Sequence, residues 1–524
     1  MKYLLVTGEL ARDYVREYAE QSNIEFDVIA VPFPVAALLT PRFVVEHLKK
    51  IDLSGYDVML VPGLLRGSAK VIEDALGIPT YKGPKDAADL PMVMEHVRRG
   101  VKLSHDVPAC ELLNMNTTKD AEREFEEAVK KALGNLREGS YLKLRDLVIS
   151  RDLPMRVMAE IVDAPKLSKN EIKRIAAHYV RSGADIIDIG VVAGQDDSDK
   201  IREIVSAIRS VTNAPISIDS LSPKEIEAAV EAGVDMVVSL ERSSIEVLHD
   251  VVRDKVCVVI PYDYASGYFP EDPEERVRAM EENVRLARRY GIEKIMADLI
   301  VNPVHAPSFV KSLVSFYEFS RRNPDVQLFM GIGNVSELMD ADSHGVNAQL
   351  VALASELGAS VVLTTEASDK TYGSVWEVAQ AVKMMYLSKV KKVFPKDLGI
   401  DLLVLKEKRR SKFKYEKMGG LTVVEAKEGR KVQYDRAGFF RIWVDHEGEN
   451  IYVMHFKWDD PKKPDLVVCG RRASDIYLEV LERGLVSDYS HAAYLGKELE
   501  KAEIALKLRK SYTQDSDLFL ELPY

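Results

Sequence analysis

The segment Gly183-Ala184-Asp185-Ile186-Ile187-Asp188-Ile189-Gly190 is a short apolar run that holds two acids and is bounded by glycine. A run of this length and composition predicts a strand that is buried on both faces. Such strands belong to parallel sheets that are covered by helices. Burying a carboxylate is costly unless it is paired or hydrogen-bonded. The buried position of Asp188 therefore needs a reason, and a ligand is one candidate.

The chain on both sides of this segment alternates between apolar strands and amphipathic helices. The predicted strands are Arg156–Val162, Ala184–Gly190, Pro215–Asp219, Asp235–Leu240, Val256–Pro261, Lys294–Ile300, Val326–Ile332 and Ser360–Thr365. Each is followed by a predicted helix, and eight strand–helix units in about 230 residues are typical of a (β/α)8 TIM barrel. Two helix starts, Ser168-Lys169-Asn170-Glu171 and Ser222-Pro223-Lys224-Glu225, have the pattern of capping boxes.

The segments on either side of the barrel predict two further domains. The N-terminal segment alternates strands and helices and predicts a small Rossmann-like or flavodoxin-like α/β domain. Its loop Pro62–Ser68 has two glycines and an arginine, which could hold an anion, although a plain strand-to-helix turn is the favoured interpretation. The C-terminal segment predicts an α+β domain whose first strand is Thr422–Ala426. We therefore expect an N-terminal α/β domain (1–140), a barrel (141–392) and a C-terminal α+β domain (393–524).

Composition narrows the class of protein. The chain has 524 residues and a formal net charge of −11, so a basic surface for nucleic acid is not expected. Its three cysteines are widely spaced, which indicates neither a disulfide framework nor a zinc site. No apolar run approaches the roughly 18–20 residues that span a bilayer. We expect a cytoplasmic protein with no membrane partner.

Acids and amides dominate the carboxyl ends of the predicted strands, where a TIM barrel places its active site. These residues are Asp163, Asp188, Asp219, Ser239, Glu241, Asp263, Asp298, Asn302, Asn334 and Glu366. Such groups accept hydrogen bonds from the ring N–H and exocyclic NH2 of a flat heterocycle. No spacing of acids predicts a resident metal site, whereas Mg²⁺ arriving with a substrate would suit this many carboxylates.

Several of these residues also have a purely structural interpretation. Asp219 precedes the helix predicted at Ser222–Ala232 and would serve as its cap. Asn334 would suit a turn. Asp298 lies inside an apolar strand, where capping explains it less well, so a functional role is favoured. His491, which begins the last predicted helix, is either a helix cap or a metal or corrinoid ligand.

The segments Gly183–Gly190, Ile216–Ser220 and Ala228–Asp235 resemble the pterin-binding barrel of dihydropteroate synthases. The whole chain resembles the archaeal dihydropteroate synthase-related proteins, which add an N-terminal α/β domain and a C-terminal domain to that barrel. The resemblance implies that acids on the third and sixth strands, Asp219 and Asp298, bind a pterin ring. Asp188 is a further candidate there. The family uses an amide on the fourth strand, and this chain has Ser239 in its place.

Two departures from the synthase pattern bear on the reaction. Val162 stands where the synthases have the Asn of an Asn-x-Thr-Pro-Asp-Ser-Phe segment, and Asp163 is the catalytic candidate in that loop. Gly333-Asn334-Val335-Ser336 replaces the Ser-Arg-Lys of the synthases. This version resembles the Ser-Asn-Val-Ser of corrinoid-linked methyltransferases, whose Asn hydrogen-bonds near the pterin N5. Asn334 is therefore a second catalytic and pterin-binding candidate.

The resemblance implies a transferase that joins a hydroxymethyl-dihydropterin diphosphate to an arylamine in folate-type or tetrahydromethanopterin-type biosynthesis. Mg²⁺ would accompany the diphosphate. Two alternatives remain. One is methyl transfer between a reduced pterin and a corrinoid protein partner, and the other is a non-catalytic pterin-binding subunit. The resemblance also implies a homodimer.

Overall fold

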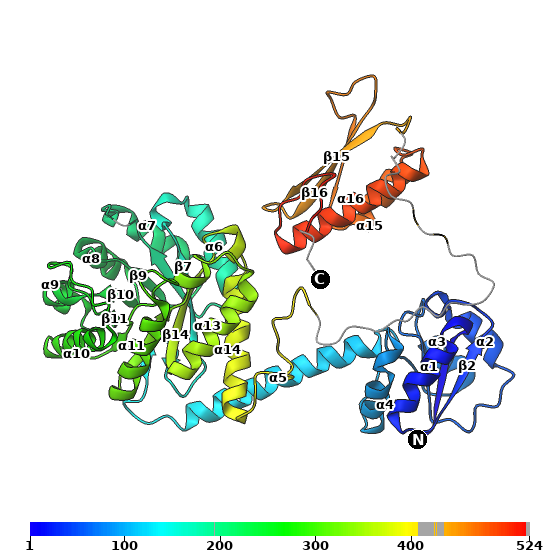
Figure 1. Cartoon of the computed structure of the whole chain (residues 1–524), viewed down its shortest axis with the longest axis horizontal. Helices are drawn as coiled ribbons and strands as arrows, with labels where there is room; N and C mark the ends of the chain where they lie inside the picture. The colour runs from blue at the N-terminus through cyan, green and yellow to red at the C-terminus, as the bar shows by residue number, and fades with distance from the viewer. Residues whose placement is uncertain (193, 407–423, 425, 427–433, 520–524) are drawn as a thin grey trace. The chain divides into compact units, whose positions relative to one another are not determined.

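The computed structural model describes residues 1–524 apart from 193, 407–423, 425, 427–433 and 520–524, and apart from the side chains of residues 114–117. The chain divides into two compact units, residues 1–413 and 414–524. The first unit contains a closed eight-stranded barrel and a separate four-stranded sheet, and the second contains a three-stranded sheet (Figure 1).

The barrel strands are all parallel, and β14 pairs with β7 to close the ring. They are β7 (Arg156–Ile161), β8 (Ile186–Gly190), β9 (Ile216–Asp219), β10 (Met236–Leu240), β11 (Val256–Val259), β12 (Ile295–Ala297), β13 (Gln327–Gly331) and β14 (Ala359–Thr365). The helices between and after them are α6 (Lys169–Ser182), α7 (Ser198–Arg209), α8 (Pro223–Ala232), α9 (Arg242–Val252), α10 (Pro273–Arg289), α11 (Phe309–Arg322), α13 (Ser343–Leu357) and α14 (Ser374–Lys391). The predicted TIM barrel is confirmed.

Alternation along each strand sorts its side chains between two cores. Ile187 and Ile189 of β8 pack outward in the large cluster that includes the surrounding helices. Ile186 belongs to the second cluster, which fills the barrel interior with residues such as Met158 and Phe329. Because successive strand side chains point to opposite faces, Asp188 and Gly190 face the interior. The strand predicted at Gly183–Gly190 is thus buried on both sides, as its composition requires.

A short hairpin that sequence patterning did not predict covers the amino end of the barrel. It consists of β5 (Leu142–Leu144) and β6 (Leu147–Ile149). Leu144 and Ile149 are buried in the same cluster as Met236 and Val256, the first residues of their strands. Each hairpin strand has three residues, which is too short for a periodic signal. Because apolar side chains fill the amino end, the polar interior positions lie at the carboxyl end.

One of the two predicted capping boxes is confirmed. The Ser168 side chain accepts from the Glu171 N–H, and the Glu171 side chain accepts from the Ser168 N–H. The box predicted at Ser222 is wrong, since the Ser222 side chain makes no capping hydrogen bond. Its partner Glu225 is buried and accepts from Ser220 Oγ at 2.5 Å and from the Asp197 N–H at 3.0 Å. Those alternative donors pull the carboxylate away from the helix start.

The N-terminal sheet has the parallel order β2-β1-β3-β4. Its strands are β1 (Tyr3–Gly8), β2 (Phe26–Val31), β3 (Val58–Val61) and β4 (Thr80–Lys82), of which the last was not predicted. One face packs against α1 (Arg12–Ala19) and α4 (Leu90–Arg98), and the other against α2 (Pro41–Leu48) and α3 (Lys70–Leu76). Helices on both faces of a parallel sheet make the doubly wound α/β fold that the sequence predicted.

A long helix, α5 (Ala109–Gly134), follows this sheet. Its first turns are buried with the sheet through Ala109 and Leu113. Further along, Ala121 packs with Met384 and Leu387 of α14. The helix is therefore shared by two hydrophobic cores. Among the residues that the structure describes, no helix is long and apolar enough to cross a membrane.

The second unit is an antiparallel sheet with two helices. It contains β15 (Phe439–Asp445), β16 (Asn450–Phe456), β17 (Leu466–Gly470), α15 (Ala473–Glu482) and α16 (Tyr489–Leu508). The strand predicted at Thr422–Ala426 lies largely outside the described residues. His491 is buried in α16, and its Nδ1 lies 3.1 Å from Asp435 Oδ2. This contact ties the helix to the segment before the sheet.

Candidate functional site

Four carboxylates face the barrel interior near the carboxyl ends of the strands. They are Glu160 on β7, Asp188 on β8, Asp219 at the end of β9 and Asp298 directly after β12. The strand register places Glu160 beside Asp188, and Gly190 beside Asp219. Asp188 is buried, and the other three are partly exposed. We call these four residues the acid cluster.

Each aspartate of the acid cluster is held by a neighbouring donor. Asp188 Oδ1 accepts a hydrogen bond from Ser217 Oγ at 2.5 Å. The Ser239 side chain is hydrogen-bonded to Asp219. Asp298 Oδ1 accepts from the Ile300 N–H at 2.8 Å. These bonds orient the carboxylates, which is what a preorganised binding site requires.

Two of those donors belong to residues in the left-handed region of backbone conformation. Ser239 has φ 71°, and Ile300 has φ 63°. This region is strongly disfavoured for a β-branched residue such as isoleucine, and such strain costs of order 1–3 kcal/mol. Ser239 also lies where the pairing of β10 with β11 shifts register. The strain falls at the two residues that orient Asp219 and Asp298, which marks this rim as a functional candidate.

A buried arginine supports the strained loop after β12. Arg276 of α10 donates to Leu299 O at 3.4 Å and to Ile300 O at 3.3 Å, and its Nε donates to Pro270 O at 2.9 Å. Its guanidinium lies 4.5 Å from the centre of the Phe269 ring. Arg276 therefore ties the loops after β11 and β12 together and supplies a positive charge near Asp298.

Burial raises the pKa of every member of the acid cluster. The pKa of Glu160 rises to about 7, first because the group is buried and then because Asp219 and other acids lie nearby. The pKa of Asp298 also rises to about 7, chiefly through burial. Burial likewise raises the pKa of Asp188 and of Asp219. Acids that are this costly to ionise favour a ligand that brings N–H donors or positive charge.

Glycine at position 190 makes room for the Glu160 carboxylate. A Cβ built on Gly190 would overlap Glu160 Oε1 and would lie 3.1 Å from Glu160 Cδ. A Cβ built on Gly331, the interior glycine that ends β13, would lie 4.0 Å from its nearest neighbours. The glycine that closes the segment Gly183–Gly190 therefore leaves the space that the Glu160 side chain occupies.

We predict that Gly190→Ala will lower the free energy of unfolding of the barrel by about 1–3 kcal/mol, because an extra methyl group in a packed interior forces its neighbours to move. Urea unfolding measures this loss, and Gly331→Ala is the matched control, which should change little. In a Glu160→Ala background the overlap is gone, so Gly190→Ala should cost much less there. An equal cost in both backgrounds would contradict this account of Gly190.

Two further predicted site residues, Asn334 and Asp163, lie near the acid cluster. Asn334 lies on α12 (Gly333–Ser336), is exposed, and donates through Nδ2 to Val301 O at 3.1 Å. It is thus held beside the loop that follows Asp298. Asp163 is partly exposed after β7, and its Oδ2 lies 2.7 Å from Lys166 Nζ. Its charge contributes to the raised pKa of Glu160, so it lies near the acid cluster.

Other acids at the strand ends have structural roles. Glu241 caps α9 by accepting from the N–H groups of Ser243 and Ser244, and it also accepts from the Tyr264 N–H at 2.9 Å. Glu366 accepts from the Val375 N–H at 3.1 Å and pairs with His178. By contrast, Asp219 does not cap α8. The N-cap position of that helix is Ser222, and the Asp219 side chain is hydrogen-bonded to Ser239.

Sequence reasoning missed Glu160. The residue stands in the apolar strand Arg156-Val157-Met158-Ala159-Glu160-Ile161, as Asp188 does in its own strand. Alternation from Met158, which faces the interior, places Glu160 on the same side. Strand alternation alone therefore predicts Glu160 on the interior face. The residue was missed because the candidates were chosen mainly among residues at or after the ends of the strands. Among the described residues, no group of three or more His, Cys, Asp or Glu side chains is arranged to hold a metal ion.

Comparison with known proteins assigns the barrel to a class. The model of the pterin binding enzyme family matches residues 162–371. Residues 434–515 match the family PterinBD-DUF4346, and residues 2–85 match a family of unknown function, DUF6513. The barrel is thus that of a pterin-binding protein.

Relatives identify the family. An uncharacterized protein of Methanocaldococcus jannaschii is 36% identical over 531 residues, which cover 99% of each chain. This chain belongs to the family of that protein, and its barrel matches the pterin binding enzyme family. A Ycf91-like protein of a Nostoc species is 29% identical over 110 residues, which are 16% of this chain and 87% of that protein.

Solved dihydropteroate synthases are similar to about half of the chain. A Yersinia pestis enzyme with a pterin–sulfa conjugate aligns with 48% of this chain and 99% of its own, at 15% identity and a TM-score of 0.39. The Xanthomonas albilineans enzyme in complex with 7,8-dihydropteroate aligns with 48% of this chain and 99% of its own, at 17% identity and a TM-score of 0.38.

Proposed function

We propose that the barrel is a transferase that joins a hydroxymethyl-dihydropterin diphosphate to an arylamine, as in folate-type or tetrahydromethanopterin-type biosynthesis. The observation that carries the proposal is the acid cluster. A pterin presents an exocyclic NH2 group and ring N–H groups along one edge, and carboxylates accept from such donors. Hydrogen bonds with an ionised partner are among the strongest in proteins. Asp219 and Asp298 would hold the ring, with Glu160 and Asp188 beside them.

The charge of the acid cluster also orients the substrate. A diphosphate would be repelled by the four acids of the cluster, so the leaving group would point away from them towards solvent. Asp163, a partly exposed carboxylate after β7, has the hard oxygen donors that suit Mg²⁺, and it would help to bind a Mg²⁺ ion arriving with the diphosphate. The ion would offset the charge that develops on the leaving group.

The proposed step forms one bond and breaks one. The amine nitrogen attacks the exocyclic carbon of the pterin, the C–O bond to the diphosphate breaks, and diphosphate leaves with the electron pair. The amine then loses a proton to solvent. The protein contributes placement of the two reactants and stabilisation of charge rather than a covalent intermediate. Asn334, held by Val301 O beside the Asp298 loop, would contact the pterin ring.

Asn334 also favours a second candidate function, which is methyl transfer from a reduced pterin to a corrinoid protein partner. An amide near the pterin N5 would stabilise the ring as the methyl group leaves, and this chain places an amide beside the loop after Asp298. A non-catalytic pterin-binding subunit is the third candidate. The homodimer implied by the resemblance stays a prediction, which light scattering of the purified protein would check.

We predict that the full chain, given 6-hydroxymethyl-dihydropterin diphosphate, 4-aminobenzoate or a related arylamine, and Mg²⁺, will release diphosphate and form a pteroate-like product detectable by mass spectrometry. Asp298→Asn should abolish both signals, because the ring would lose its acceptor. No diphosphate release, together with methyl exchange between methyl-tetrahydropterin and cob(I)alamin, would select the second candidate. Tight pterin binding without either reaction would select the non-catalytic subunit.

A further inference from the structure

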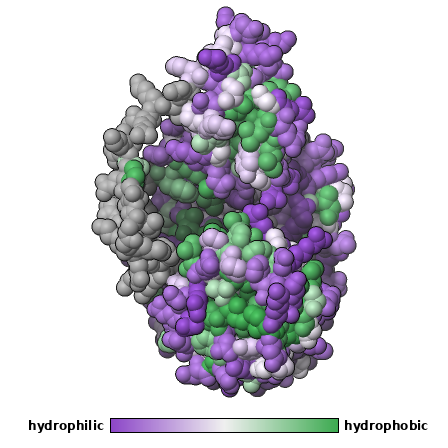
Figure 2. Space-filling view, turned by 90° about the vertical axis from the view of Figure 1, so that its right-hand side faces the viewer, coloured by the Kyte–Doolittle hydropathy of each residue, from purple (hydrophilic) through white to green (hydrophobic). Residues whose placement is uncertain are grey.

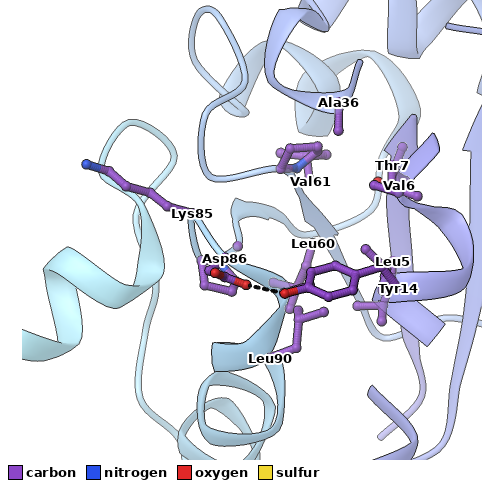
Figure 3. Close-up of a pocket in the computed structure, with 16 residues that line it drawn as sticks. Leu5, Val6, Thr7, Tyr14, Ala36, Leu60, Val61, Lys85, Asp86 and Leu90 are labelled. Carbon is purple, nitrogen blue, oxygen red and sulfur yellow. Dashed lines mark hydrogen bonds between the residues drawn. The ribbon is translucent and has the colours of Figure 1, made fainter. Parts of the chain in front are cut away.

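Two sheets outside the barrel each border a cavity. The cavity of the N-terminal sheet lies at its strand ends, and Figure 3 shows Leu60 and Leu90 near the hydrogen bond from Tyr14 Oη to Asp86. The cavity of the C-terminal sheet, of about 400 Å³, lies along a strand instead. It is lined by residues 466–469 of β17, by Asp475, Ile476 and Glu479 of α15, and by Arg483. Because a strand borders this second cavity, backbone groups as well as side chains are available to a ligand.

Strand β17 lies at the edge of its sheet, and among the described residues it pairs with β16 alone. The Asp465 N–H donates to His455 O at 3.0 Å, so the backbone of His455 faces β17, and Leu466 lies opposite it in the register. Successive residues of an antiparallel strand direct their backbone groups to opposite sides. Val467 and Cys469 therefore direct their N–H and C=O groups away from β16, and we call these groups the open edge of β17.

Helix α15 forms the other wall of the cavity. A Cβ built on Gly470 would lie 3.2 Å from Ile476 Cγ1, so the helix packs directly on β17. Asp475 and Glu479, one helical turn apart, line the cavity from this helix. An exposed sheet edge binds an extended peptide as an added strand, with main-chain hydrogen bonds for affinity and side-chain contacts for specificity. The groove between β17 and α15 offers both.

The helix wall of this groove has more negative than positive charge. Arg483 Nε donates to Glu479 Oε1 at 2.6 Å, so these two charges are paired. Asp475 accepts from Ser474 Oγ at 3.1 Å and has no ion-pair partner within the described part of the chain. The excess negative charge favours a peptide that has basic side chains on the face directed towards α15.

The opposite face of the sheet is apolar beside the open edge. Val468 packs against the core under the helices, so its neighbours Val467 and Cys469 lie on the opposite face. The register sets Cys469 beside Tyr452 and Tyr452 beside Trp443, and Trp443 is 63% exposed. Figure 2, whose upper part shows this unit, has apolar residues among hydrophilic ones there. An added strand would extend this face with apolar side chains.

A second copy of this chain does not suit the open edge. Neighbouring strands lie roughly 4.8 Å apart, whereas packed helices need about 8–10 Å between their axes. Because α15 packs directly on β17 through Ile476 and Gly470, pairing of β17 with β17 of a second copy would bring the two α15 helices into the same space. An extended peptide without an adjoining helix meets no such obstacle.

We propose that the groove between β17 and α15 binds an extended peptide segment of a partner protein, which adds a fourth strand to the C-terminal sheet. The basic side chains of this segment are directed towards Asp475 and Glu479, and its apolar side chains lie beside Val467 and Cys469. The site belongs to the C-terminal unit and does not depend on the reaction proposed for the barrel.

The test is binding of four synthetic peptides to the full chain by calorimetry. The first, Ac-Lys-Val-Arg-Val-Lys-Thr-NH2, alternates basic residues with uncharged ones, and the second has Glu at each basic position. The other two have the first sequence with N-methyl groups either on the three basic residues or on the three uncharged residues. Successive N–H groups of a strand point to opposite edges, so only one of these two sets faces β17.

We expect the basic peptide to bind and the acidic peptide to bind much more weakly. One N-methyl peptide should lose binding, because it lacks the N–H groups that face β17, and the other should retain it. Binding by charge alone would not distinguish these two peptides, since both keep the charge of the parent.

Asp475→Lys should weaken binding of the basic peptide by about tenfold, since a repulsion replaces an attraction. Glu482→Lys is the matched control, because it makes the same change of charge on an exposed α15 residue that does not line the groove, and it should change the affinity little. Asp298→Asn, a change in the barrel, should also leave peptide binding unaltered, so failure of this proposal is distinguishable from failure of the proposed function.

The proposal would be overturned if the basic peptide does not bind, if both N-methyl peptides bind equally, or if Asp475→Lys and Glu482→Lys have equal effects. Light scattering tests the alternative occupant. A full chain that self-associates, binds no peptide and becomes monomeric with Asp475→Lys would assign the groove to a second copy, and this result would also overturn the proposal.

Discussion

Asp298→Asn is expected to weaken the binding of a dihydropterin to the full chain by about 100-fold, measured by calorimetry at pH 8. Hydrogen bonds to charged groups contribute about 1.5–3 kcal/mol each, and about 1.4 kcal/mol is tenfold in affinity. Asn keeps the shape of the side chain but turns one acceptor into a donor that would face the ligand's own N–H. The Ile300 N–H, which now donates to Asp298 Oδ1, can still be satisfied by the amide oxygen.

Two variants make this result specific to the acid cluster. Asp219→Asn should have an effect of similar size, because Asp219 faces the same interior space. Asp163→Asn is the matched control, since Asp163 is a partly exposed aspartate in the loop after β7 whose carboxylate pairs with Lys166, and it should leave dihydropterin affinity nearly unchanged. If neither Asp219→Asn nor Asp298→Asn alters binding, the pterin does not occupy the acid cluster.

The stability of the ligand-free barrel should fall as pH rises from about 5 to 8. The pKa of Glu160 is about 7 in the folded protein, against 4.5 for the free side chain. Between these values the folded state holds a proton that the unfolded state has lost, so raising the pH favours unfolding. The stabilising contribution is complete below the unfolded pKa and is lost as pH rises through 7. At 1.36 kcal/mol per pKa unit, Glu160 alone accounts for roughly 3 kcal/mol.

Hydrogen exchange of peptides from β7 and β8 in increasing urea, repeated at pH 5.5 and pH 8, measures this change for the barrel alone. Glu160→Gln should flatten the difference, and Asp298→Asn, whose pKa is also about 7 in the wild type, should reduce it further. Asp163→Asn should reduce the difference only slightly, because the Asp163 charge is a minor contributor to the raised pKa of Glu160. If the wild type is equally stable at both pH values, folding does not raise the pKa values of the acid cluster, and this prediction is wrong.

The cluster also links pH to ligand binding. A dihydropterin whose N–H groups donate to Asp219 and Asp298 needs these acids ionised, and both pKa values are raised by burial. Binding would therefore release protons near neutral pH, and affinity would increase from pH 6 to pH 8. A ligand that donates to these acids would offset the cost of ionising them, which is the role that we propose for the dihydropterin.

Local patterning was enough to predict the architecture. Gly183–Gly190 is more apolar than a strand with one solvent-exposed face, which predicts burial on both faces. Eight such strands, each followed by a helix, predict a closed parallel barrel. The same patterning placed Asp188, Asp219 and Asp298 near the carboxyl ends of their strands. These predictions succeed because burial and strand alternation are properties of neighbouring residues along the chain.

Local sequence patterns do not predict contacts between segments that are far apart in the chain. Whether Glu225 caps its own helix or turns to Ser220 and Asp197 depends on which donors the fold brings near. The short hairpin that covers the amino end has too few residues to give a period, and its place depends on the barrel interior that it covers.

The sequence by itself thus determined a buried parallel strand with an acid inside it, the barrel that follows from its repetition, and the side of each strand on which its residues lie. Tertiary structure alone decided that Glu160 packs over Gly190, that Ser239 and Ile300 take strained conformations to orient Asp219 and Asp298, and that these acids share one low-polarity space. The physical reason is that alternation acts between adjacent residues, whereas the pKa of a carboxylate depends on every charge and dipole that folding brings around it.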